Sequence, residues 1–582
     1  MSNKRHQWGV TAPISTASPS DHELHLTESL LKALGDFHLF ECEAEALKRK
    51  QVLEELDRLV KDFVVRVGKA KGLSDPLATD AGGKIFTFGS YRLGVHSAGA
   101  DIDTLCVVPQ HVEREQFFTI MQDMLKARSE VTDLTAVPEA YVPVIKLRFS
   151  GIPIDLVFAQ LSLPRVPDDL DLKDNNLLKN IGEQCVRSLN GSRVTDEILR
   201  LVPNIPVFRI ALRTIKLWAK RRAIYSNVMG FLGGVAWAML TARVCQLYPN
   251  ACAASIVNRF FRIMYQWNWP QPILLKHLED GPLEVRVWNP KLYPADKSHR
   301  MPIITPAYPS MCATHNVTDS TRDIMLKEFK RGAEVVEKIV VKSGNWSELF
   351  EESDFFQIYK HYLQIVVTST TPEAKLLWSG YVESRIRQLV LKLELVDMLL
   401  LAHPYINGID RVHYCISDKE RLEAAQGIYA SDRTFRLGEG DPLKELKKQP
   451  SWPKEQDTRS VQPIYTTTFY IGLCVGPKSD THPPTNGPRT LDLVWPTQEF
   501  IKLVRSWDKF DSHTMNVCVK TLKSSMLPSE LAGEDKVKRP PTKQKAPSAA
   551  VSPNKKFRGD IETANPPAPP VENEPKNHTS KQ

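Results

Sequence analysis

The stretch FGSYRLGVHSAGADIDTLCVV, residues 88–108, places two aspartates, Asp101 and Asp103, at the start of an apolar run. The run has the composition of a strand, in which alternate residues face the same way. The two carboxylates would then share one face, with their Cα atoms about 6–7 Å apart. Like charges this close are unfavourable unless a cation lies between them. Upstream, Gly89-Ser90 forms a turn whose glycine lets a phosphate approach the backbone and whose serine offers hydrogen-bond donors.

A third acid lies on a strand of the same β-rich block. In IPIDLVF, residues 152–158, apolar residues alternate along one face and leave Asp155 on the other. If the strands are neighbours, Asp101, Asp103 and Asp155 form one acidic cluster. Such a cluster favours Mg²⁺ or Mn²⁺, and two ions about 3.5–4 Å apart suit a phosphoryl displacement. The alternative is a solvated strand end, the more common origin of a lone Asp-x-Asp pattern.

The totals fit a soluble protein of several domains. The 582 residues suggest two to four domains, and the formal charge of +8 permits a polyanionic partner. Nine scattered cysteines without a CxxC pattern argue against a zinc site and for a reducing compartment. The N-terminus lacks a signal peptide, and the longest uncharged stretch, 227–242, is too short for a bilayer. We therefore expect an intracellular protein without membrane attachment.

Hydrophobic periodicity divides the first two thirds of the chain into a β-rich and a helical part. Helices are predicted within 21–66 and over 113–127, 208–222 and 229–247, and strands over 84–90, 100–109 and a hairpin at 141–160. Pro143 and Pro153 suggest that the hairpin lies near a sheet edge.

The last third mixes strands and helices. Strands are predicted over 360–369, 466–476 and 515–522, and helices over 372–394 and 495–507. This order fits a β-α-β-β-α-β sandwich of ferredoxin type with a long insertion near 405–463. The proline-rich, polar stretch 526–582 is predicted to be disordered. The fold class is therefore α+β.

Two levels of resemblance follow from these motifs. Gly89-Ser90, a gap of ten residues and Asp101-Ile102-Asp103 resemble the signature of the polymerase-beta-type nucleotidyltransferase superfamily, with Thr104 a small departure where many members have an apolar residue. Four further segments resemble the nuclear poly(A) polymerases of eukaryotes: SLNGSRVTDEILRLVPN (188–204), IKLWAKRRAIYSNVMGFLGGVAWAML (215–240), VCQLYPNA (244–251) and MPIITPAYP (301–309). The similarity runs from about Trp8 to about residue 525.

The resemblance implies a domain for each block. We expect an N-terminal arm at 1–20, a nucleotidyltransferase catalytic domain with a mixed sheet at 48–164, a helical central domain at 21–47 and 165–340, an RNA-binding domain resembling the RNA-recognition-motif fold at 341–525, and a disordered basic tail at 526–582.

The resemblance also assigns roles to residues. Asp101, Asp103 and Asp155 would be catalytic and would hold two Mg²⁺ or Mn²⁺ ions. The expected ATP contacts are Phe88, Gly89, Ser90, Lys216, Tyr225, Gly234, Val235 and Thr305, and Asn190 and Lys146 are expected near the ribose or the RNA 3′ end.

The expected nucleotide site has partial support from physical chemistry. Lys216 and Lys220 share a helix face, where like charges are slightly unfavourable, so an anion such as a triphosphate would suit them. A solvated basic face is the alternative. Gly233-Gly234 inside an apolar helix would be costly unless a flat base or a packed helix comes close.

The implied function is template-independent addition of AMP from ATP to RNA 3′ ends, with pyrophosphate as the leaving group. A uridylyltransferase and a catalytically inactive RNA-binding scaffold remain alternatives. The resemblance implies recruitment by cleavage-and-polyadenylation factors and a location in the nucleus, and we expect a monomer. Two basic clusters at 536–545 and 552–558 suit a nuclear import receptor, although basic tails also attract RNA without sequence preference.

Overall fold

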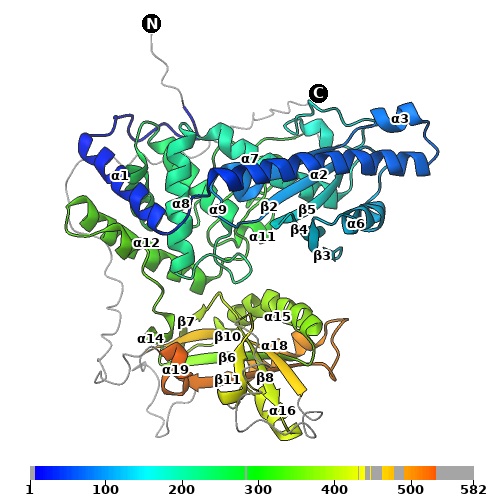
Figure 1. The fold of residues 1–582 in the computed structure, drawn as a ribbon. Coiled ribbons are helices and arrows are strands. Elements are labelled where there is room, and N and C mark those ends of the chain that lie inside the picture. The colour runs from blue at the N-terminus through cyan, green and yellow to red at the C-terminus, as the bar shows by residue number, and fades with distance from the viewer. Residues whose placement is uncertain are drawn as a thin grey trace, which may run out of the picture. The chain divides into compact units, whose positions relative to one another are not determined.

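The computed structural model describes residues 7–281, 283, 285–429, 431–438, 446, 462–476 and 491–532. Over these residues the chain has the expected α+β fold, with two sheets and a set of long helices (Figure 1). The two basic clusters of the tail lie outside the described residues. No helix of the described chain is both long and apolar enough to cross a bilayer.

The first sheet is mixed and has the strand order β1-β2-β5-β4-β3. Its strands are β1 (Lys84–Phe88), β2 (Ile102–Val108), β3 (Val131–Val137), β4 (Val144–Phe149) and β5 (Ile152–Gln160). Strands β2 and β5 pair in parallel, and the other pairs are antiparallel. The sequence predicts four of these strands and misses β3. This edge strand has no buried residue, so it lacks the apolar alternation that marks a strand.

The β4–β5 hairpin turns at Ser150-Gly151 as predicted, but its expected place near a sheet edge is wrong. Strand β5 lies in the middle of the sheet, between β2 and β4. Pro153 is tolerated there because the pairing of β5 with β2 begins only at Ile154. Pro143 precedes the first residue of β4 and takes no place in the ladder.

Two long helices pack on this sheet. Helix α2 (Glu43–Ala70) contacts β1, and α7 (Glu183–Leu201) contacts β5 and β1. Figure 1 shows α2 running along the sheet. Phe63 of α2 joins Leu105 and Leu156 of the central strands in one buried core. The helix predicted over 113–127 is present as α5 (Arg114–Gln116), a π-helical turn η1 (Phe117–Met121) and α6 (Gln122–Lys126).

One part of the second buried cluster is a helical core. It draws on α1 (Asp21–Asp36), α8 (Ile205–Arg221), α9 (Gly234–Leu247), α10 (Ala253–Gln266) and α12 (Asp319–Val340). Helix α8 begins where the Asn204 side chain accepts a hydrogen bond from the Val207 N–H. Its buried face reaches Trp218, whose ring packs edge-on against Trp237 with centroids 5.6 Å apart.

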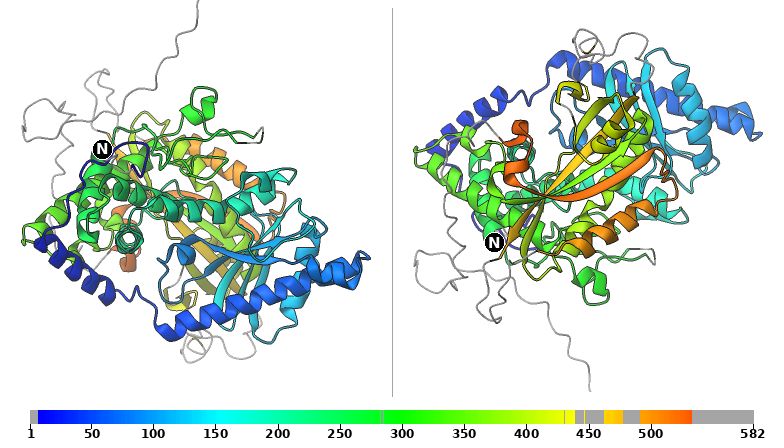
Figure 2. Two further views of the ribbon diagram at one scale, coloured as in Figure 1. Left: turned by 90° about the horizontal axis from the view of Figure 1, so that it is seen from above. Right: turned by 90° about the horizontal axis from the view of Figure 1, so that it is seen from below.

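The second sheet has the order β11-β6-β10-β8-β9, and β7 pairs with the far end of β10. Its strands are β6 (His361–Ser369), β7 (Leu399–Pro404), β8 (Ile409–Cys415), β9 (Thr434–Arg436), β10 (Gln462–Val475) and β11 (Met515–Lys523). Figure 2 shows their shared twist, in yellow-green to orange. Helices α15 (Pro372–Leu393) and α18 (Val494–Arg505) contact each other and the sheet.

This arrangement confirms the ferredoxin-type prediction and corrects its insertion. The second strand is split, since β7 pairs with residues 471–475 of β10 and β8 with residues 462–468. The predicted insertion at 405–463 therefore contains β8, α16 (Asp418–Ala425) and β9, and its stretch 447–461 lies outside the described residues.

Short helices and turns complete the described chain: α3 (Asp75–Asp80), α4 (Gly89–Leu93), η2 (Asn175–Leu178), α11 (Pro294–Lys297), α13 (Trp346–Leu349), α14 (Phe355–Ile358), η3 (Ser431–Arg433), η5 (Ser524–Met526) and α19 (Ser529–Ala532).

Candidate active site

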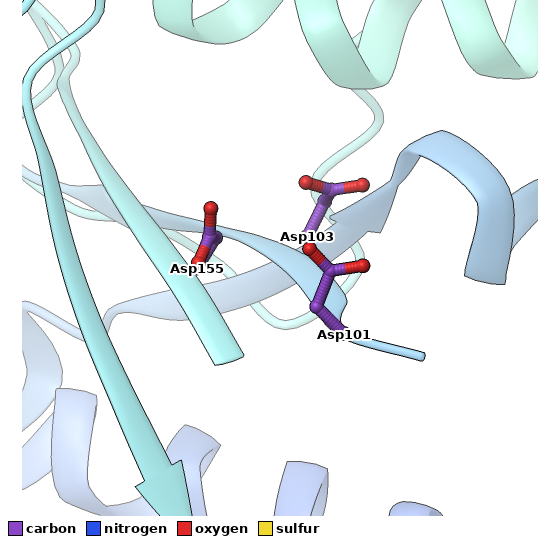
Figure 3. A group of neighbouring side chains, drawn as sticks. All are labelled: Asp101, Asp103 and Asp155. Carbon is purple, nitrogen blue, oxygen red and sulfur yellow. The ribbon is translucent and has the colours of Figure 1, made fainter. Parts of the chain in front are cut away.

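The parallel pairing of β2 with β5 brings the three acids together. Asp103 of β2 lies directly opposite Asp155 of β5, and Asp101 is the residue immediately before β2. One carboxylate oxygen of each acid lies within 4.8 Å of the others. Figure 3 shows the three side chains projecting to the same side of the sheet. The hydroxyl of Thr104, where many superfamily members have an apolar residue, donates a hydrogen bond of 3.2 Å to the Asp155 carbonyl and ties the two strands together.

Burial and the neighbouring acids together change the protonation of Asp103. Burial, and then the charges of Asp101 and Asp155, raise the pKa of Asp103 to about 7, against the opposing influence of Lys146 and Lys216. The charge of Asp103 is therefore poorly compensated by the protein. Carboxylate oxygens in this arrangement fit the preference of hard divalent cations for oxygen ligands. The residues present thus fit one or more such ions.

Lys146 is the nearest cation of the sheet. It lies opposite Asp155 in the β4–β5 ladder, and its ammonium forms an ion pair with the Asp155 carboxylate. The Lys146 side chain is about half exposed, so this pair contributes little to stability. The sequence predicts a contact of Lys146 with RNA or phosphate; the structure places it at the acidic cluster.

Position 89 must be a glycine because the side chain of Asp103 fills the space beside it. Its φ is +63°, a left-handed conformation, and a Cβ at this position would stand 2.1 Å from Asp103 Oδ2. Its N–H donates a 3.3 Å hydrogen bond to the Thr195 hydroxyl of α7. The sequence predicts that this glycine admits a phosphate, and no local pattern reveals that it makes room for Asp103. Thr195 is missed by the sequence because only the fold brings α7 to this turn.

Lys216 and Tyr225 border the cluster on the helical side. Burial, and then Lys220 and Arg213, lower the pKa of Lys216 to about 8, while Asp101 and Asp103 oppose this. Its ammonium donates a 3.3 Å hydrogen bond to the Val95 carbonyl. Burial, and then Asp103 and Asp101, raise the pKa of Tyr225 to about 12, so its phenol stays protonated. Together they offer a cation and a hydroxyl beside the acids.

Gly234 is a first helical residue and not, as predicted, an interior one. Helix α9 begins at Gly234 with Gly233 as its N-cap, so neither glycine interrupts a helix. A Cβ at position 234 would stand 2.6 Å from the Tyr225 hydroxyl, which is the close approach that excludes a larger residue. Val235 follows on the same turn and is 39% exposed, as a surface for a ligand requires.

The other predicted contacts lie on elements around the acids. Phe88 pairs with Asp103 in the β1–β2 ladder and packs on Gly191 of α7. The residue before this glycine, Asn190, has a buried amide oxygen without a hydrogen-bond partner in the described structure. Ser90 lies in the short helix α4, where its carbonyl accepts from the Val95 N–H. The Thr305 hydroxyl accepts from the Met311 N–H in a separate loop.

Comparisons with known proteins cover nearly all of the described chain. Family models match for a poly(A) polymerase nucleotidyltransferase domain at residues 9–202, a poly(A) polymerase central domain at 207–352 and a poly(A) polymerase predicted RNA-binding domain at 354–541. The chain is 55% identical over 543 residues to the poly(A) polymerase pla1 of Schizosaccharomyces pombe, covering 91% of this chain and 95% of that protein. It is 48% identical over 541 residues to the poly(A) polymerase PAPalpha of Candida albicans, covering 92% and 94%.

A solved structure of Cid1, described as an RNA terminal uridylyl transferase, is similar with a TM-score of 0.40 and 14% identity, covering 57% of this chain and 99% of that one. A likeness at this level carries no argument about the substrate.

The raised pKa of Asp103 predicts that the charge of this residue lowers the free energy of unfolding at high pH. Between pH 4 and 7 the folded chain holds a proton on Asp103 that the unfolded chain releases, so the free energy of unfolding falls as the pH rises through this range. In metal-free buffer we expect Asp103→Asn to raise the free energy of unfolding by about 2–4 kcal/mol at pH 8 and to leave it nearly unchanged at pH 4. Urea unfolding of both proteins at both pH values measures this.

The exposed acid Asp123 of α6 is the matched control, because Asp123→Asn removes an aspartate charge from another element of the same sheet domain. Added Mn²⁺ should raise the thermal midpoint of the wild type and not that of Asp103→Asn. A variant less stable than the wild type at pH 8 would contradict the assignment of uncompensated charge to Asp103.

The close approach of Gly89 to Asp103 predicts that Gly89→Ala displaces the acid. Gly72→Ala is its control, since Gly72 has a φ of +83° and nothing lies within 4 Å of the place that its new methyl group would take. Both changes should lower stability through left-handed strain of about 1–2 kcal/mol. Only Gly89→Ala should also weaken Mn²⁺ binding, by about tenfold or more, a loss of about 1.4 kcal/mol. Equal Mn²⁺ affinity of the two variants in a calorimetric titration would disprove the steric role of Gly89.

Proposed function

Because this chain belongs to the poly(A) polymerase family, we propose that its three acids hold two divalent ions at which RNA 3′ ends are extended with AMP. The chain is a nucleotidyltransferase that polyadenylates RNA, as its relatives are named. The observation that carries the site is the convergence of Asp101, Asp103 and Asp155 within 4.8 Å. In the reaction, the 3′-hydroxyl oxygen of RNA forms a bond to the α-phosphorus of ATP, and the bond to pyrophosphate breaks.

Each acid has a distinct place in this proposal. Mg²⁺ or Mn²⁺ at the cluster would lower the pKa of the attacking hydroxyl and neutralise charge on the leaving pyrophosphate. Asp101 and Asp103, two residues apart on one chain segment, would bind both ions. Asp155, on the neighbouring strand, would bind on the side of the attacking hydroxyl and accept its proton.

The helical side would bind the nucleotide. Lys216 would supply a cation and Tyr225 a hydroxyl donor for the triphosphate, since both are influenced by Asp101 and Asp103, and Ser90 would supply a second hydroxyl. Gly234 and Val235 at the start of α9 would contact the adenine, with Phe88 and Thr305 nearby. Because no template is read, the choice of ATP would depend on hydrogen bonds and stacking in this pocket.

RNA would contact the acidic cluster and the last domain. Asn190, whose amide oxygen has no partner in the described structure, is suited to a ribose or terminal hydroxyl. Lys146 would contact the RNA once Asp155 is neutralised. The domain matched at 354–541 would bind the RNA backbone. We also propose a monomer that acts in the nucleus, is imported through 536–558 and is recruited by cleavage-and-polyadenylation factors.

The alternatives are weaker. The names of the relatives support adenylate and not uridylate as the added nucleotide. An inactive scaffold would be free to lose this acidic cluster, in which burial, and then the like charges, raise the pKa of Asp103 to about 7.

Primer extension tests the proposed reaction. Wild type, Asp155→Ala and the control Asp123→Ala would each be given an unstructured RNA primer, Mg²⁺ and one of ATP, CTP, GTP or UTP. We expect adenylate addition by the wild type and the control, and a loss of about 10³-fold or more in Asp155→Ala, because removing one ligand disrupts transition-state stabilisation. Preferential addition of uridylate would contradict ATP as the substrate. Full activity of Asp155→Ala would contradict the assignment of the three acids as the catalytic site.

The lowered pKa of Lys216 predicts how ATP binding depends on pH. Lys216 is cationic below about pH 8 and loses its charge above it, so the affinity for the triphosphate should fall as the pH rises through this value. We expect KM for ATP to increase by up to about tenfold per pH unit from pH 8 to 9.5. In Lys216→Arg the charge persists, so its profile should be flatter over this range. Parallel profiles of the two proteins would exclude Lys216 as the titrating contact.

A further inference from the structure

A partly buried ionic cluster lies where α1 connects to α2, and it reaches the loop that leads to the acids. It consists of Glu41, Glu45, Arg49 and His96. The Arg49 guanidinium contacts Glu41 and Glu45, each at 3.0 Å, and Glu41 Oε1 lies 2.7 Å from His96 Nε2. The Arg49 side chain is 0% exposed. Three of the four residues thus come from the junction and the first turns of α2, and the fourth comes from the loop 94–100.

Glu45 holds this loop a second time. The Gly99 N–H donates a 2.8 Å hydrogen bond to Glu45 Oε1, the same oxygen that accepts from Arg49. The bond from Gly99, and then that from Arg49, lower the pKa of Glu45, so it is a carboxylate at neutral pH. Gly99 is two residues before Asp101. The cluster therefore fixes the backbone immediately ahead of the first acid.

The same loop also contacts the residues expected to bind the nucleotide. The beginning of the loop is attached to Ser90, because the Val95 N–H donates a hydrogen bond to the Ser90 carbonyl. The Val95 carbonyl accepts from the Lys216 ammonium, and the Leu93 carbonyl accepts a 2.8 Å hydrogen bond from Arg209 Nε. A displacement of the loop would thus move Asp101 and Lys216 together.

Stability alone does not account for this cluster. Burial of a charge such as that of Arg49 costs several kcal/mol of desolvation, and an apolar replacement of a buried ion pair is often as stable. Ring contacts also hold the junction: the Arg213 guanidinium lies over the Phe40 ring, and the rings of Tyr91 and His96 are 5.0 Å apart. An apolar replacement could not accept the hydrogen bond from the Gly99 N–H, which the ionic cluster does.

We propose that Glu41, Glu45, Arg49 and His96 form a positioning cluster that sets the place of Asp101, and through Val95 that of Lys216, for metal and nucleotide binding. None of the four touches the reacting groups. The proposal deepens the proposed function and rests on it, because it assumes that the three acids bind divalent ions.

The test compares three variants of one helix. Glu45→Ala removes the hydrogen bonds that Glu45 accepts from Gly99 and from Arg49. Glu45→Gln keeps an acceptor for the Gly99 N–H. Glu43→Ala removes an exposed acid of the same turn and is the control. The dissociation constant of Mn²⁺ is measured by electron paramagnetic resonance with the α,β-methylene analogue of ATP, together with kcat and the thermal midpoint. We expect Glu45→Ala to weaken Mn²⁺ binding by about 10-fold and lower kcat by a similar factor. Glu45→Gln should recover most of this, and Glu43→Ala should match the wild type.

His96→Phe is a second variant in case Glu45→Ala does not fold. It keeps a ring against Tyr91 and loses the bond to Glu41, and it should also weaken Mn²⁺ binding. If both variants have lowered thermal midpoints but wild-type Mn²⁺ affinity and kcat, the cluster is only structural and the proposal fails. A wild type whose Mn²⁺ affinity equals that of Asp155→Ala would instead overturn the metal site itself, so the two failures are distinguishable.

Discussion

Repulsion among three carboxylates is the constraint on which the site depends. The β2–β5 ladder places Asp103 opposite Asp155, and Asp101 enters just before the ladder begins. A shift of one strand by one residue would not relieve this cheaply, because it would turn the buried side chains of that strand to the opposite face of the sheet. The hydrophobic core under the sheet thus holds the acids together against their charge, and the pKa of Asp103 near 7 shows how little the protein compensates it. A cation from solution is the remaining source of compensation.

The surroundings of the acids can be understood from the space and charge that they need. Gly89 leaves a position vacant for Asp103 Oδ2, and Thr195 satisfies the N–H of that glycine. Lys216 lies close enough to be influenced by Asp101 and Asp103, yet its hydrogen bond goes to a backbone carbonyl and not to a carboxylate. The cation is therefore not consumed by an ion pair with the acids. It remains available to an anionic ligand that arrives with its own metal ions.

The sequence predicts most of the fold, and it also predicts that the three acids lie together. An Asp-x-Asp pattern beside a strand aspartate has a local signature, and so do the apolar faces of α2, α8 and α15. Strand β3 has none, because an edge strand without buried residues lacks alternation. The sequence places Gly234 inside a helix because apolar residues precede it, although the helix begins there. The contacts of Gly89 and Glu45 join segments far apart in the chain, and no periodicity records them.

The three acids and Lys216 are carried by different hydrophobic cores. The distance between them therefore depends on the segments that connect these cores. Asp103 and Asp155 are carried by strands of the sheet core, whereas Lys216 is on α8 of the helical core. Helix α7 joins the two, since Leu189 packs in the first and Ile198 in the second. The α1–α2 junction joins them again, with Leu34 in the helical core and Phe63 in the sheet core. The distance between the acids and Lys216 therefore depends on α7 and on the α1–α2 junction. The loop from Ser90 to Asp101 connects both parts to the site, because it forms hydrogen bonds with α2 and with α8.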